Sequence, residues 1–133
     1  MKLNGMTSLW ARTALIWFLV TICFGMFMGM TKQFNYAPAH AHLGVLGWLS
    51  SAVFALIYAV AREWPEGARA PSLHWAAHNI GLIVMGFGLD MLGRTGDDAH
   101  WGPIIGIGGA IIILATIWLT IMVWPRLSAR SGA

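Results

Sequence analysis

The chain has 133 residues, of which 58% are apolar and only 10% are charged, and its formal net charge is +3. An ordinary soluble domain carries about 25% charged residues, so this chain has too few polar side chains to coat a water-soluble globule. The composition excludes a soluble domain and predicts an integral membrane protein in contact with a lipid bilayer.

Four apolar runs follow one another along the chain, and each can cross a hydrocarbon core about 30 Å thick at about 1.5 Å per helical residue. We therefore expect an all-α, integral membrane four-helix bundle that forms one domain over residues 1–133. The first run is longer than the ~7–15 apolar residues of a signal peptide, so it is expected to be a retained span. The expected spans are about 13–31, 40–61, 72–92 and 103–124.

The basic residues between the runs predict the orientation, because cytoplasmic segments keep the excess of Lys and Arg. One side has only Lys32 and Arg94, so both termini and the 62–71 connection are expected to be cytoplasmic in a bacterial-type inner membrane. These basic residues suit lipid headgroups, and no nucleic-acid partner is expected. The other six are Lys2, Arg12, Arg62, Arg69, Arg126 and Arg130.

Several uncharged residues are assigned to packing or to the membrane surface. Four tryptophans fall at expected span ends, where an indole ring suits the headgroup layer. Two small-residue pairs four apart favour close helix packing in lipid. Cys23 is the only cysteine, which excludes an intrachain disulfide, and we expect it to be buried. The tryptophans are Trp10, Trp64, Trp101 and Trp124, and the small-residue pairs are Gly25 with Gly29 and Gly102 with Gly106.

Four of the five histidines lie at the start of a span or inside one. An ionisable side chain in a membrane is costly and is therefore a functional candidate, although a histidine near a span end can also be simply interfacial. His40 and His42 are two residues apart, so on a helix they diverge by about 200° and serve two sites rather than one ion. His74 and His78 are four apart and share a face, and together they can chelate one ion. Because no third acidic or thiol ligand accompanies them, an intrahelical or interfacial role is expected instead.

Acidic residues form a further candidate site near the outer end of the bundle. Asp97, Asp98 and His100 lie in the expected outer connection, on the same membrane side as His40 and His42. They can take up a divalent metal, but a solvated hydrophilic loop is the favoured interpretation. Asp90 is expected to pair with Arg94 one helical turn later.

Two strings resemble a known family. His40-Ala41-His42-Leu43-Gly44-x-x-Gly47 and, one span later, His78-Asn79-Ile80-Gly81 resemble the late helices of the large subunit of haem-copper oxidases, most closely the nitric-oxide reductase branch. The likeness covers about the last third of that subunit. It implies haem b, with His40 as ligand of a high-spin haem and His42 as ligand of a low-spin haem.

The sequence also departs from that family. It has neither the adjacent histidine pair nor the His-Pro-Glu-like motif of the catalytic copper centre, and it lacks the early helix that gives the second low-spin ligand. His78 is expected about 20 Å from His42 along the membrane normal, too far to share an iron. The second ligand is therefore expected from another subunit. Three copies would restore the family's twelve helices, with His40 of one protomer facing His42 of the next in a homotrimer.

The expected function is bis-histidine haem binding for electron transfer or for redox or gas sensing. Bis-histidine iron has no open position for a substrate, which weighs against catalysis. One alternative is a copper- or other metal-handling protein that uses His40, His42, His100 and Asp97 or Asp98. Another is a small channel or transporter whose histidines line a polar path. A redox partner is implied, and nothing in the sequence indicates its identity.

Overall fold

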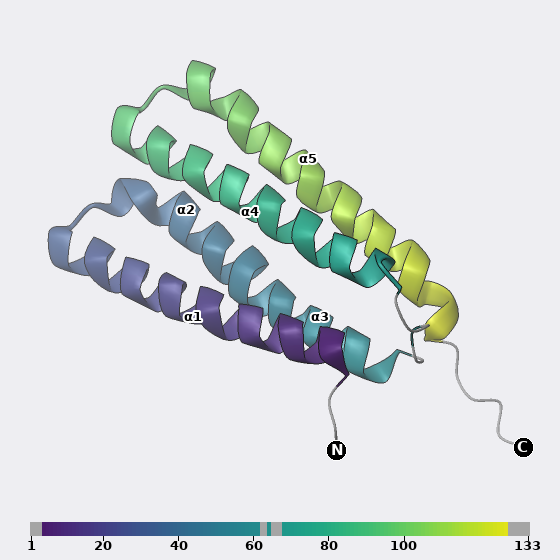
Figure 1. Cartoon of the computed structure of the whole chain (residues 1–133). Helices are drawn as coiled ribbons and strands as arrows, with labels where there is room; N and C mark the ends of the chain where they lie inside the picture. The colour runs from purple at the N-terminus through teal and green to yellow at the C-terminus, as the bar shows by residue number, and fades with distance from the viewer. Residues whose placement is uncertain (1–3, 62–63, 65–67, 128–133) are drawn as a thin grey trace, which may run out of the picture.

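The computed structural model describes residues 4–61, 64 and 68–127. Within these ranges the chain is helical and has no strand, and four helical segments are long and apolar enough to cross a membrane (Figure 1). The expected all-α membrane fold is confirmed. The elements are α1 (Gly5–Thr31), η1 (Phe34–Tyr36), α2 (Ala37–His42), the π-helix η2 (Leu43–Leu49), α3 (Ser50–Val60), α4 (Ala70–Thr95), α5 (Asp98–Val123) and η3 (Trp124–Arg126).

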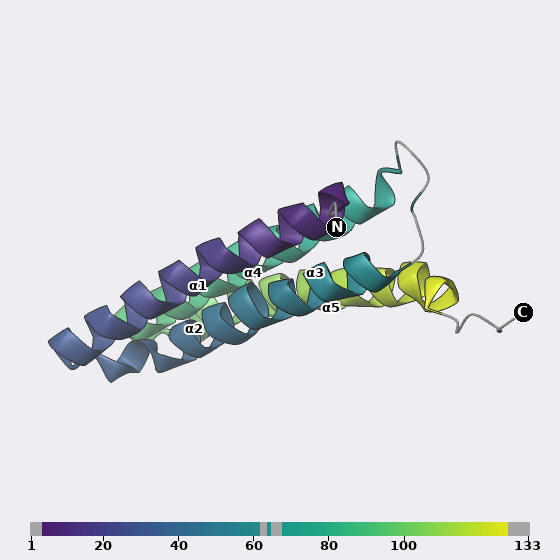
Figure 2. The same ribbon diagram turned by 90° about the horizontal axis from the view of Figure 1, so that it is seen from below.

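The helices pack as two hairpins, and Figures 1 and 2 show α1 beside the run from α2 to α3, and α4 beside α5. The side chain of Asn4, which caps α1, donates a 2.9 Å hydrogen bond to the carbonyl of Tyr58 near the end of α3. The start of α1 and the end of α3 thus lie side by side, and Figure 1 shows the end of α5 at the same end of the bundle. Of the basic residues used for the orientation, Lys2, Arg62 and Arg130 lie outside the described residues.

The connection between α4 and α5 is shorter than the expected 93–102 segment. α4 ends at Thr95 and is capped by Gly96, whose φ of 69° lies in the left-handed region that glycine tolerates. Asp97 then caps α5 by accepting a 3.1 Å hydrogen bond from the backbone N–H of His100. Asp98 and His100 therefore belong to the first turn of α5, and the expectation of a loop there was wrong.

Glycines let α4 and α5 approach closely. A Cβ added at Gly81 would come within 2.8 Å of the Gly108 carbonyl oxygen, and one at Gly108 within 2.5 Å of the Met85 nitrogen. The expected packing role is seen for Gly25, whereas Gly29, Gly102 and Gly106 contact no other helix among the described residues. Among the described residues, a Cβ at Gly29 or Gly106 meets nothing within 4 Å, and one at Gly102 meets only Asp98 of its own helix.

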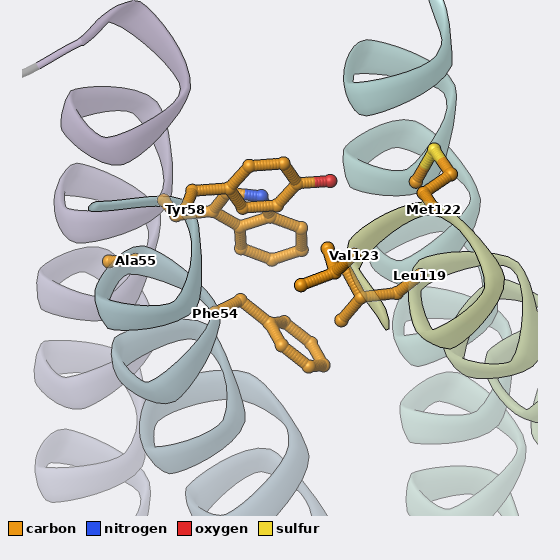
Figure 3. Packing of buried hydrophobic residues seen from close by; sticks show 7 residues of the cluster. Phe54, Ala55, Tyr58, Leu119, Met122 and Val123 are labelled. Atoms are coloured by element: carbon orange, nitrogen blue, oxygen red, sulfur yellow. The ribbon is translucent and has the colours of Figure 1, made fainter. Parts of the chain in front are cut away.

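Buried side chains join the two hairpins near the end of the bundle where α1 begins (Figure 3). Trp10 is fully buried there, so the expectation that it marks a headgroup layer was wrong. The reason is that α1 begins at Gly5, well before the expected start of the span. Trp124, which directly follows α5, is 77% exposed. This cluster contains Trp10, Phe54, Ala55, Tyr58, Leu119, Met122 and Val123.

The outward faces of the helices are apolar and suit contact with lipid. Leu15, Ile16 and Leu19 of α1 are each more than 60% exposed. Cys23 is also exposed on this helix, so the expectation of a buried cysteine was wrong. Helix association in lipid depends on close packing and hydrogen bonds rather than on burying every apolar side chain.

Candidate functional site

His42 ends α2 with its ring held by the preceding turn. Its Nδ1 lies 2.7 Å from the carbonyl oxygen of Pro38. A carbonyl oxygen only accepts, so Nδ1 carries the proton and donates, and Nε2 keeps a free lone pair. Histidines that ligate metals commonly donate their other ring N–H to a backbone carbonyl in this way. His42 is only partly buried.

His40 lies against α1. A Cβ added at Gly25 would come within 2.8 Å of the His40 Cε1 atom, and the Phe24 and His40 ring centroids are 6.3 Å apart. The absence of a side chain at Gly25 therefore makes room for the imidazole. The His40 Nδ1 is buried and has no hydrogen-bond partner among the described residues. Thus His40 faces the neighbouring helix and His42 is held by its own, in keeping with the divergence that their spacing predicts.

A π-helix follows His42 directly and was not anticipated. The backbone N–H and the hydroxyl of Ser50 both bond to the carbonyl of Val45, five residues earlier, the hydroxyl at 2.9 Å. Wide turns of this kind are rare and often occur at functional sites. Within this segment, the Leu46 carbonyl lies 2.9 Å from the His78 Nε2 and accepts its proton. The sequence has no established pattern that predicts such a turn.

His74 and His78 are each 1% exposed and bond to the second span, so the expectation of an intrahelical or interfacial role was wrong. The His74 Nδ1 lies 3.2 Å from the hydroxyl oxygen of Tyr58. Because His78 bonds to Leu46, one turn along the chain from His42, it also lies closer to the level of His42 than the expected 20 Å. The expected separation of His42 and His78 along the membrane normal was too large, because the helices extend beyond their apolar runs.

Aromatic rings surround the two buried histidines. The Trp10 centroid is 5.0 Å from that of His74 and 5.5 Å from that of His78, and the Phe54 centroid is 5.0 and 5.1 Å from them. Buried polar atoms in proteins almost always have partners. Here several buried polar atoms lack a partner among the described residues, and the sequence did not predict that they would gather in one place. They include Trp10 Nε1, Ser51 Oγ, His74 Nε2 and His78 Nδ1.

The acidic candidates have structural roles where α5 begins. Asp97 caps α5, and the charge of Asp98 in the first turn suits the positive end of the helix dipole. The His100 ring packs against Trp101, with centroids 4.7 Å apart. Across the described residues, no three His, Cys, Asp or Glu side chains come together as a metal-ligand group.

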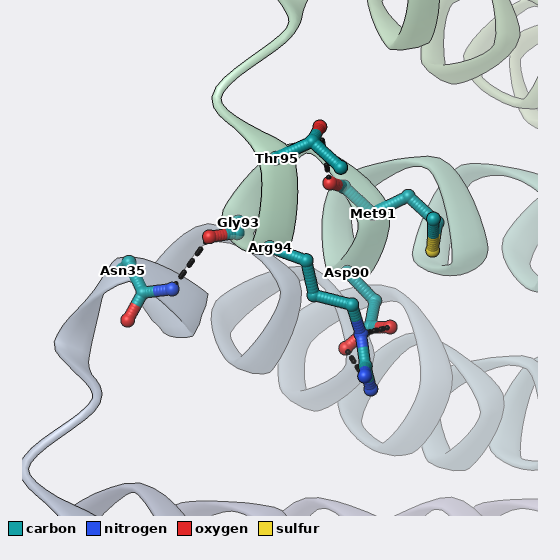
Figure 4. Close-up of polar contacts among 6 residues, drawn as sticks. All are labelled: Asn35, Asp90, Met91, Gly93, Arg94 and Thr95. Carbon is teal, nitrogen blue, oxygen red and sulfur yellow. Dashed lines mark hydrogen bonds and ion pairs between the residues drawn. The ribbon is translucent and has the colours of Figure 1, made fainter.

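The expected pairing of Asp90 with Arg94 is confirmed and anchors this end of α4 (Figure 4). The Arg94 Nε donates to the Asp90 Oδ2 at 2.7 Å. Close by, the Asn35 side-chain amide donates a 2.6 Å hydrogen bond to the Gly93 carbonyl. This bond joins the segment that leads into the His40 and His42 helix to α4, so both histidines lie near a fixed end of the bundle.

Comparison with known proteins adds no relative. No protein-family model matches this sequence, and neither the curated proteins nor the solved structures give a match.

Proposed function

We propose that this chain binds haem b through His40 and His42 and uses the iron for electron transfer or redox sensing. The observation that carries the proposal is the hydrogen bond from the His42 Nδ1 to the Pro38 carbonyl, which leaves Nε2 as the coordinating atom. The resemblance of the two histidine strings to haem-copper oxidases gives the same assignment. A bound haem would supply a one-electron ferric–ferrous couple.

The residues around the site fit that group. His42 presents its Nε2 from a ring that the Pro38 carbonyl keeps in one tautomer. Gly25 leaves space for the His40 ring beside α1, where any side chain would displace it. The exposed apolar side chains of the spans suit a porphyrin, whose faces are apolar, as well as lipid.

A shared site between protomers follows from the divergence of the two rings. His40 packs on the α1 helix of its own chain and His42 does not, so one chain does not bring both imidazoles to one iron. We therefore propose a homotrimer in which His40 of one protomer and His42 of the next hold each haem, in a ring of identical heterologous contacts. Its proposed place is a bacterial inner membrane, with both termini in the cytoplasm.

Iron with two imidazole ligands is six-coordinate and keeps no position for a substrate. The proposed role is therefore electron transfer rather than catalysis. Iron held by a single histidine would instead leave a position for oxygen or nitric oxide, and the protein would then sense a gas.

Three alanine variants test the ligand assignment. His42→Ala and His40→Ala should each abolish the low-spin visible spectrum of purified protein, because each removes an iron ligand. His100→Ala is the matched control, since this exposed histidine is on the same membrane side and should leave the spectrum intact. A full low-spin spectrum in the His42→Ala protein would end the assignment.

A further inference from the structure

His74 and His78 have two unpaired nitrogens inside the bundle. One nitrogen of each ring is in a hydrogen bond, the His74 Nδ1 with the Tyr58 hydroxyl at 3.2 Å. The His78 Nε2 bonds to the Leu46 carbonyl at 2.9 Å. The other two, His74 Nε2 and His78 Nδ1, are buried and have no partner among the described residues. Since both residues are 1% exposed, bulk water does not satisfy these atoms, and a partner inside the folded protein is needed.

The hydrogen bonds direct the two unpaired nitrogens toward each other. Tyr58 and Leu46 are about 18 Å apart along the second span, so the nitrogens bonded to them point toward opposite ends of the bundle. Within an imidazole ring the two nitrogens point away from one another. The unpaired nitrogen of each ring is therefore directed into the gap between His74 and His78, whose ring centroids are 6.3 Å apart.

The gap between the rings has the size of one metal ion. Two metal–nitrogen bonds of about 2.0 Å each, together with the half-widths of the rings, place two imidazole centroids about 6 Å apart when the bonds are collinear. The observed 6.3 Å matches a linear arrangement, whereas a tetrahedral angle at the metal requires closer rings. The unpaired nitrogens of His74 and His78 form no hydrogen bond with each other, so the gap is not closed by direct contact.

Both rings are held as metal-binding histidines usually are. The Leu46 carbonyl can only accept, so the proton of His78 is on Nε2 and its Nδ1 has a lone pair. The Tyr58 oxygen can accept the Nδ1 proton of His74, which leaves a lone pair on Nε2. Histidines that bind metals commonly donate their other ring N–H to an oxygen in this way.

The surroundings of the gap favour an ion of single charge. Among the described residues the carboxylates are Asp90, Asp97 and Asp98, which lie near the end of α4 and the start of α5 and do not balance charge here. The rings of Trp10 and Phe54 each pack on both histidines, with centroids 5.0 to 5.5 Å away. Aromatic rings stabilise a nearby cation, but a second uncompensated charge would be costly to bury.

We propose that the His74 Nε2 and the His78 Nδ1 bind one copper(I) ion in a linear, two-coordinate site between the hairpins. Of the metals that imidazole suits, copper is the one with a stable monovalent state, whereas zinc takes four ligands. Because both histidines are buried, the ion is taken up as the hairpins associate, and its binding stabilises the folded bundle. The site is separate from His40 and His42 and does not depend on haem binding. Nor is it the copper centre of haem-copper oxidases, whose histidine motifs this chain lacks.

X-ray absorption spectroscopy tests the geometry on the full chain, produced in copper-supplied cells and purified in detergent without oxygen. We expect one copper per chain, with two nitrogen neighbours at about 2.0 Å and the strong edge feature of linear copper(I). Three or more neighbours, or a sulfur neighbour, would overturn the site. So would a copper-free protein from these cells.

Substitutions test the ligands by competition with the copper(I) chelator bathocuproine disulfonate. His74→Leu and His78→Leu should each lose copper at chelator concentrations that leave the unaltered protein loaded. Tyr58→Phe keeps the ring but removes the oxygen behind His74, and it should weaken copper binding about 10–100-fold. The exposed His100 gives the matched control, because His100→Leu should retain copper.

Two results with the variants would contradict the assignment. One is unchanged copper affinity in a His74→Leu or His78→Leu protein that keeps its helical circular dichroism. The other is loss of copper in the His42→Ala protein, which would assign the ion to the haem-ligand candidates instead. If neither leucine variant folds, the number of copper neighbours in the unaltered protein still decides the question.

Discussion

At the scale of single residues, backbone groups set the chemistry of two histidines in opposite senses. The Pro38 carbonyl takes the Nδ1 proton of His42 and leaves Nε2 free, whereas the Leu46 carbonyl takes the Nε2 proton of His78 and leaves Nδ1 free. The Nδ1 atom is next to the Cβ substituent of the ring and is therefore more crowded than Nε2. Of the two, His42 is the better placed ligand for a large flat group such as a porphyrin.

The contact between Gly25 and His40 leads to a prediction at this scale. Gly25→Ala should lower the haem content of the purified protein, because the new Cβ would lie 2.8 Å from the His40 Cε1 and force the ring to move. Overpacking of this kind costs about 1–3 kcal/mol of stability. Gly29→Ala, one turn later in α1, is the control because its Cβ meets no described residue within 4 Å. Equal haem content in the two variants would show that haem binding does not depend on the position of the His40 ring.

Residue contacts were predictable only where both partners belong to one helix. The pairing of Asp90 with Arg94 follows from their four-residue spacing, and so does the divergence of His40 from His42. The bond from His74 to Tyr58 and the burial of Trp10 depend on a second helix, whose register no periodicity in one span reports. Cys23 was misassigned for the same reason.

At the scale of helices, hydropathy predicted four spans but not where the helices end. α1 begins before its apolar run, and α5 begins at Asp98, ahead of Pro103, because side-chain caps at Asn4 and Asp97 start each helix in a polar segment. The π-helix Leu43–Leu49 changes the register of the second span without any change in hydropathy. These features position the candidate site, yet they come from local hydrogen bonds that apolar patterns do not encode.

The packing of α4 on α5 gives a prediction about stability. Gly108→Ala should destabilise the protein by about 1–3 kcal/mol, because its Cβ would lie 2.5 Å from the backbone nitrogen of Met85, which has no freedom to move aside. Gly106→Ala is on the same helix, its Cβ meets nothing within 4 Å in the described part of the chain, and it should be neutral or stabilising by up to about 1 kcal/mol. Thermal unfolding in one detergent, followed by circular dichroism, compares the two. The packing account would fail if Gly108→Ala unfolded at the temperature of the unaltered protein.

At the scale of the whole molecule, the distribution of charge predicts the orientation. Among the described residues Arg12, Arg69 and Arg126 are on the expected cytoplasmic side, and Lys32 and Arg94 are on the other. A reporter that is active only in the periplasm should therefore be inactive when fused at Ala133 and active when inserted at Gly96, in the short connection between α4 and α5. The reverse pattern of activity would contradict the orientation.

The haem between protomers is the central claim, and native mass spectrometry of the protein purified from haem-supplied cells tests it most directly. A group bound only by the assembled state stabilises that state by mass action, so we predict a haem-bearing trimer of the 14.5 kDa chain that separates into protomers when haem is removed. A mass spectrum in which no species carries haem would contradict haem binding. A monomer that carries haem would contradict the shared site.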